Sequence, residues 1–218
     1  HSSWPDMVFC TYDYYFDTDA AYYGCRKACE PIHIQWNPST RKVEVVNVSA
    51  GDRSSLVARA YVLDMYGREL SVAETGLDSA EDSTVECFPL GIPAAQDVYY
   101  YRLELRSGED LMSENFYVLG RETDNFQALH KLPQARVKAE FRDGVLTLTN
   151  VSEVPAMMLR IKALDTGTGE MLLPARISDN YFHLMPGECR KLSVSSWNGD
   201  IAVRPEIRGF NVELTYPR

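Results

Sequence analysis

Two stretches of the chain alternate apolar and polar residues and then end in the same triplet, Asn-Val-Ser. Residues 43–49 read Val-Glu-Val-Val-Asn-Val-Ser, and residues 146–152 read Leu-Thr-Leu-Thr-Asn-Val-Ser. A period of two is typical of β-strands that bury one face. A second apolar stretch follows each triplet and ends in Leu-Asp before a glycine turn, at Asp64 and at Asp165. Each half of the chain therefore predicts a strand, a loop, a longer strand and a tight turn.

The spacing of these repeats predicts how the chain is organised. Asn47 and Asn150 are 103 positions apart, and the two Leu-Asp pairs are 101 apart. This is about the length of one β-sandwich domain, and it predicts an all-β chain of two consecutive β-sandwiches. Further strands are expected at about 69–77, 83–88, 98–106 and 112–119, and again at about 170–177, 179–184, 188–195 and 207–215.

One helix is predicted, over residues 17–30. Asp17, Thr18 and Asp19 supply capping side chains, residues 20–30 lack β-branched side chains, and Pro31 stops the helix. Tyr22, Cys25 and Cys29 fall on one helical stripe. We therefore expect the helix to dock on the first sandwich and to bury Tyr22 and Cys29.

Composition narrows the classes of function. The net charge of −9 and the pI near 5.0 argue against a surface for nucleic acid or for an anionic membrane. No apolar run reaches the roughly 20 residues that span a bilayer. The five cysteines are too few and too scattered for a disulfide scaffold, and buried, reduced thiols are expected. A zinc site at Cys25 and Cys29 would lack its other ligands, so we expect neither metal nor cofactor.

No catalytic motif is present in the sequence. The nucleophile-elbow, zinc-protease, P-loop and dinucleotide-binding patterns are all missing, and the four histidines lie far apart. Tyr99 and Tyr101 share one strand face and are expected to pack in the core, with a sugar platform as the alternative. Asp165-Thr166-Gly167-Thr168-Gly169 is expected to be a hairpin turn rather than a calcium loop.

Several motifs near the start of the chain resemble the junction in glycoside hydrolase family 2 enzymes where the catalytic (β/α)8 barrel meets C-terminal immunoglobulin-like domains. They are Trp4-Pro5, Tyr12-Asp13-Tyr14-Tyr15, Tyr22-Tyr23-Gly24 and the run from Lys27 to Gln35. Residues 178–188, Ser-Asp-Asn-Tyr-Phe-His-Leu-Met-Pro-Gly-Glu, resemble the last domain of the same enzymes. The resemblance is to β-mannosidases, exo-β-D-glucosaminidases and mannosylglycoprotein endo-β-mannosidases.

The resemblance implies a fragment with a structural, non-catalytic role in a larger glycosidase. Residues 1–30 would be the terminal segment of the barrel, 31–120 the first sandwich, 121–133 a connector and 134–218 the second sandwich. The two catalytic glutamates would precede His1, so no enzymatic activity is expected from this chain. Trp4 would wall the sugar pocket in the intact parent only.

The same resemblance implies partners and a compartment. The parent's own barrel would be the partner, carbohydrate would be bound through the parent, and the parent would be periplasmic or secreted. An alternative is a tandem without a parent enzyme, either of adhesion type or carbohydrate-binding through exposed aromatics such as Trp197. Asn47 and Asn150 also stand in Asn-x-Ser sequons, which are glycosylated only in a eukaryotic secretory context.

Overall fold

A computed structural model describes residues 11–121, 125–197 and 202–217. The chain divides into two compact units, one formed by Arg26–Leu132 and the other by Pro133–Arg218 together with the residues up to Cys25. We call Arg26–Leu132 the first sandwich, Pro133–Arg218 the second sandwich, and residues 11–25 the N-terminal segment. Among the described residues no helix is long and apolar enough to cross a membrane.

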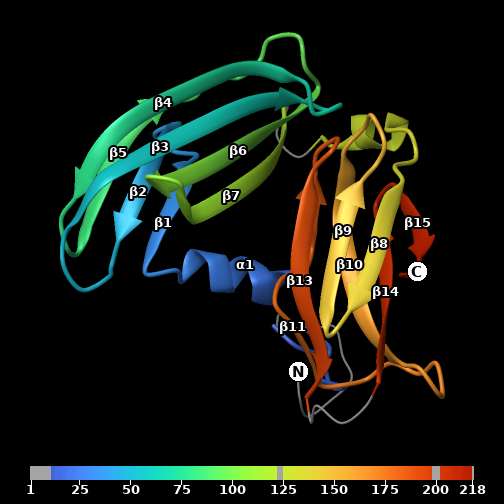
Figure 1. Cartoon of the computed structure of the whole chain (residues 1–218). Coiled ribbons are helices and arrows are strands. Elements are labelled where there is room, and N and C mark those ends of the chain that lie inside the picture. Colours follow the sequence, from blue (N-terminus) through green and yellow to red (C-terminus); the bar gives the residue numbers. More distant parts are fainter. Residues whose placement is uncertain (1–10, 122–124, 198–201, 218) are drawn as a thin grey trace. The chain divides into compact units, whose positions relative to one another are not determined.

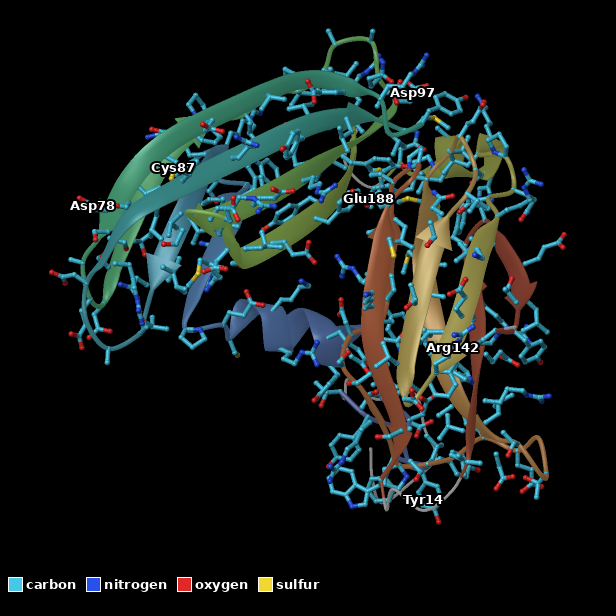
Figure 2. All side chains as sticks on the ribbon, viewed as in Figure 1. Tyr14, Asp78, Cys87, Asp97, Arg142 and Glu188 are labelled. Carbon is cyan, nitrogen blue, oxygen red and sulfur yellow. The ribbon has the colours of Figure 1, made fainter. Side chains whose placement is uncertain are left out.

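The first sandwich consists of two antiparallel sheets that face each other (Figure 1). The smaller sheet has the order β1 (Ile32–Asn37), β2 (Lys42–Asn47), β5 (Ser83–Pro89). The larger has the order β4 (Glu69–Ser79), β3 (Arg53–Asp64), β6 (Val98–Ser107), β7 (Asp110–Gly120). Alternate residues of both sheets point inward, and they bury one apolar cluster that includes Ile34, Val45, Ala60 and Leu103. Figure 2 labels Asp78 on β4 and Cys87 on β5.

The second sandwich repeats this strand order. One sheet is β11 (Ala175–Ile177), β13 (Cys189–Ser196), β9 (Val145–Asn150), β8 (Val137–Arg142), and the other is β12 (Phe182–Leu184), β10 (Ala156–Asp165), β14 (Val203–Gly209), β15 (Val212–Thr215). Strands β8, β9 and β13 correspond to β1, β2 and β5, while β10, β14 and β15 correspond to β3, β6 and β7. The predicted all-β fold of two immunoglobulin-like sandwiches is confirmed.

Each of the four sheets takes its strands from one side of the Leu132–Pro133 bond. The expected connector contains a short 3₁₀ helix, η1 (Gln127–Lys131). The domain borders inferred from the resemblance, including the assignment of residues 1–30 to a barrel, stay a prediction.

Some strand predictions differ from the structure in detail. The single strand expected over about 207–215 is two strands, β14 and β15, because the chain turns at Phe210 and Asn211. Buried Asn211 holds this turn: its Nδ2 donates to the carbonyls of Pro133 and Pro155, and its Oδ1 accepts the N–H of Met157. A strand was expected over about 170–177, but only residues 175–177 form one.

Side chains of β7 close one edge of the first sandwich. Strand β1 is the last strand of its sheet, so one side of its backbone lacks a neighbouring strand. Ser113 accepts the N–H of Ile34, Asn115 donates to the carbonyl of Ile34, and the Tyr117 hydroxyl accepts the N–H of Trp36 at 3.0 Å. Alternate residues of β7 thus satisfy an edge that would otherwise be open to pairing with another chain.

Candidate functional site

The one substrate-binding residue that the resemblance suggested, Trp4, lies outside the described residues, so its role in the intact parent stays a prediction. The described residues that follow it form a compact loop. Asp13 organises this loop: its Oδ1 accepts the N–H groups of Tyr15 at 2.8 Å and Asp17 at 3.0 Å, and its carbonyl accepts the N–H of Phe16. Tyr12 and Thr18 form an isolated antiparallel bridge across the loop. The carboxylate therefore fixes a tight turn, which is its usual role in loops.

The loop presents four aromatic side chains to solvent. Between 41% and 60% of each is exposed, and they are Tyr12, Tyr14, Tyr15 and Phe16. Tyr12 stacks on Phe16, and Tyr14 packs edge-on against Tyr15. In Figure 2, Tyr14 lies at the end of the second sandwich opposite Glu188. Contiguous exposed aromatics on an ordered loop are typical of an interaction surface.

Two contacts anchor the N-terminal segment to the second sandwich. Arg160 of β10 donates to Oδ2 of Asp17 at 2.7 Å. The ring of Tyr23, which is only 5% exposed, lies 6.0 Å from the ring of Tyr181, and its hydroxyl accepts a hydrogen bond from Thr18. The Arg160 guanidinium also lies over the Tyr181 ring at 5.9 Å. An ion pair, an aromatic pair and a cation–π contact therefore meet at one place.

At this anchor, burial and the charge of Arg160 have opposite effects on the pKa of Tyr181. Burial raises the pKa of the Tyr181 hydroxyl, and the positive charge of Arg160 acts in the opposite direction. Tyr181 has a positive φ of 57°, a conformation that most side chains avoid. The ring is thus held in a fixed position to receive Tyr23.

The predicted docking of the helix on the first sandwich through Tyr22 and Cys29 is wrong. Helix α1 (Ala20–Ala28) begins after Asp19, whose side chain accepts the N–H of Tyr22 as an N-cap. Tyr22 is 38% exposed, and Cys25 and Cys29 are also exposed. The buried residue is Tyr23, because its ring packs on Tyr181 and so turns the predicted stripe toward solvent.

The residues after the helix make separate contacts within the first sandwich. Lys27 lies 3.7 Å from the Glu114 carboxylate, and Ser113 donates to the Glu30 carboxylate at 2.7 Å. The Nδ1–H of His33 donates a hydrogen bond to the Glu30 carbonyl at 3.2 Å, which is the structural role expected for it.

The cysteines differ from the expectation of buried thiols. Cys25, Cys29 and Cys189 are exposed, and Cys87 is partly buried. Burial raises the pKa of the Cys87 thiol to about 11, so this thiol is protonated and unreactive at neutral pH. Within the described ranges no three His, Cys, Asp or Glu side chains gather as metal ligands would.

The most buried carboxylates hold strands and turns together. Asp64 accepts the N–H groups of Tyr66 and Arg68 and pairs with the Arg68 guanidinium at 2.7 Å. Glu104 lies between Arg102 and Arg106, at 3.0 and 3.1 Å. Asp165 likewise accepts the N–H groups of Gly167 and Thr168, so the predicted hairpin turn is confirmed.

The hypotheses that aromatic side chains bind sugar have different outcomes at Tyr99 and Tyr101 and at Trp197. Tyr99 and Tyr101 are 3% and 0% exposed within the first core, so the sugar-platform alternative for them is wrong. Trp197 at the end of β13 is 56% exposed, and Arg176 of β11 lies 4.3 Å from its ring centroid. Its position on the surface agrees with the sequence-based expectation of an exposed aromatic.

Fold and surfaces together define a tandem of immunoglobulin-like sandwiches whose second member holds an aromatic N-terminal segment. Residues 115–212 match the family model described as Exo-beta-D-glucosaminidase Ig-fold domain. This region of the chain therefore resembles the Ig-fold domain of exo-β-D-glucosaminidases.

Similar proteins extend the comparison over the whole chain. An exo-β-D-glucosaminidase of Streptomyces avermitilis is 28% identical over 100% of this chain and 28% of its own length. A mannosylglycoprotein endo-β-mannosidase of Lilium longiflorum is 26% identical over 95% of this chain and 30% of its own. The crystal structure of the exo-chitosanase CsxA of Amycolatopsis orientalis superposes with a TM-score of 0.84 at 25% identity, over 99% of this chain and 30% of that chain. This chain thus spans less than a third of the relatives that it matches.

Proposed function

We propose that this chain is the non-catalytic C-terminal part of a family 2 exo-glycosidase of the exo-β-glucosaminidase or β-mannosidase type, and that its second sandwich braces the end of the catalytic barrel. The comparisons support the first half of this proposal, because similar proteins named for these activities match this chain over only part of their length. Carbohydrate would reach the protein through the parent's barrel, which is also the proposed partner.

One observation carries the bracing role. The N-terminal segment contains the motifs that resemble the end of the barrel, yet its ion pair and aromatic contact are made with Arg160 and Tyr181. They lie 143 positions beyond Asp17 and 158 positions beyond Tyr23, respectively. The second sandwich is therefore well placed to hold the last residues of a barrel.

A double-mutant cycle on this chain tests the anchor. Asp17→Asn, Arg160→Gln and the double variant would be compared by urea unfolding. Because both side chains are partly buried and hydrogen-bonded, we expect a coupling energy of about 1 kcal/mol. The matched control is the exposed pair Lys138–Glu140 within β8, for which Lys138→Gln and Glu140→Gln should couple by less than about 0.5 kcal/mol.

The same variants test the function in the longer protein that we propose. Arg160→Gln should shorten the half-life of activity at elevated temperature and leave KM for an aryl glycoside unchanged. An unchanged half-life, with coupling energy measured in this chain, would remove the bracing role and leave the family assignment intact.

A further inference from the structure

We propose that Trp197 and Arg176 form a binding platform for a neutral polysaccharide chain on the outer face of the sheet β11–β13–β9–β8. This deepens the proposed function by assigning a second carbohydrate contact, away from any barrel, and it rests on the carbohydrate-active character proposed above. The platform lies within the second sandwich.

Trp197 is held at its backbone and contacted by Arg176, yet much of the residue is exposed. The backbone N–H of Trp197 donates to the carbonyl of Pro174 at 3.2 Å, and the Arg176 guanidinium lies 4.3 Å from the ring centroid. Arg176 itself is held by the pairing of β11 with β13, opposite Ser195. Trp197 is nevertheless 56% exposed, which leaves more than half of the residue open to a ligand.

Other arginine–aromatic contacts in the same sandwich serve packing. Phe182 beneath Arg190 is 6% exposed, and Tyr181 beneath Arg160 receives the ring of Tyr23. Tyr216, over which Arg204 lies at 4.9 Å, is 39% exposed, and its hydroxyl bonds to Glu206. Trp197 combines the largest ring with the greatest exposure of these four.

Two serines lie on the surface next to Trp197. Positions 193 and 195 of β13 share its face, because side chains alternate along a strand, and they are Ser193 and Ser195. Ser195 lies opposite Arg176 in the pairing register. An aromatic plane takes the C–H face of a pyranose, and hydroxyls beside it can exchange hydrogen bonds with the sugar's own hydroxyls.

Charge selects the kind of sugar. Arg176, whose guanidinium lies over the Trp197 ring, carries a positive charge. A polymer with free amines would be repelled at neutral pH, whereas a neutral chain of mannose or of N-acetylated units would not. The platform therefore favours neutral over cationic polysaccharide.

Affinity electrophoresis of the full chain through gels containing soluble mannan, glycol chitin or glycol chitosan tests the proposal. Retardation is expected with a neutral polymer, with at least a tenfold smaller association constant for Trp197→Ala and a several-fold smaller one for Arg176→Ala. Tyr216→Ala is the matched control and should bind like the wild type. Circular dichroism of each variant establishes that it is folded.

No retardation of the wild type in any gel, or equal retardation of folded Trp197→Ala, would overturn the platform. Retardation by glycol chitosan alone would contradict the charge argument and the proposal with it. These outcomes are separate from those of the anchor experiments, because binding here requires neither Asp17 nor a catalytic barrel.

Discussion

Asn47 and Asn150 occupy the same place in the two sandwiches, each as the last residue of the second strand and each fully buried. The Oδ1 of each accepts both the N–H and the hydroxyl of the serine two residues later, Ser49 or Ser152. The Nδ2 of Asn47 donates to the carbonyls of Gly51, Ser79 and Ala80, and that of Asn150 to the carbonyls of Val154 and Leu184. In both sandwiches, the asparagine of the Asn-Val-Ser triplet thus connects a strand end to two loops through side-chain hydrogen bonds.

Asn150→Ala should destabilise the second sandwich by about 2–4 kcal/mol, because it leaves the buried carbonyl of Leu184 without its donor and removes the partly buried bonds to Val154 and Ser152. Urea unfolding of the variant measures this loss. Val151→Ala is the control at a neighbouring, 52% exposed position and should change stability by less than about 0.5 kcal/mol. Equal effects of the two substitutions would mean that the carboxamide does not hold the loops.

Burial of these asparagines also predicts the fate of the two sequons. Both Nδ2 groups are engaged in hydrogen bonds to backbone carbonyls and are closed to solvent, so a glycan cannot be accommodated in the folded chain. When the chain is secreted from a eukaryotic host, the folded product should have the unmodified mass at both positions. A folded, cooperatively unfolding protein that carries a glycan on Asn47 or Asn150 would contradict this.

The sequence repeat made the two-sandwich architecture predictable. The placement of the N-terminal segment could not be predicted in this way. Alternation before Asn47 and Asn150 and the turns at Asp64 and Asp165 are local signals, and they located both sandwiches. The choice of Tyr22 over Tyr23 as the buried face failed because Tyr23 is buried by Tyr181, and Asp17 by Arg160, more than 140 positions away. Helical periodicity within nine residues contains no information about such distant partners.

Gly209 is a second position that local sequence would not single out. A Cβ there would lie 2.9 Å from the Met157 carbonyl oxygen and 3.0 Å from the Val212 Cβ, at the turn between β14 and β15. Gly209→Ala should therefore cost about 1–3 kcal/mol through overpacking. The control is Gly76→Ala in β4, where the nearest atom would be 3.9 Å away. Thermal unfolding of both variants distinguishes a steric cause from a general intolerance of alanine in strands.

His183 should make the stability of the second sandwich depend on pH. Its Nδ1 accepts the N–H of Met158 at 3.0 Å, and burial together with nearby Arg190 lowers its pKa to about 4. Arg190 itself pairs with Asp179. The unfolded chain binds the proton more readily, so stability is lost as the pH falls from about 6.5 toward about 4, by at most about 3 kcal/mol.

The variant His183→Gln isolates this effect from the titration of carboxylates. Urea unfolding at pH 7.0 and pH 4.5 should show a smaller loss of stability for His183→Gln than for the wild type. Equal losses would mean that His183 keeps its ordinary pKa in the folded chain.

Hydrolysis of aryl β-D-glucosaminide and aryl β-D-mannoside by the purified chain tests the central claim most directly. We propose an accessory role for this chain, with both catalytic carboxylates elsewhere in a longer protein. We therefore expect a rate equal to that of the buffer blank across the pH range 4–8, beside a full-length exo-β-D-glucosaminidase as positive control. Turnover above the blank that follows the 24.7 kDa chain through successive purification steps would contradict it.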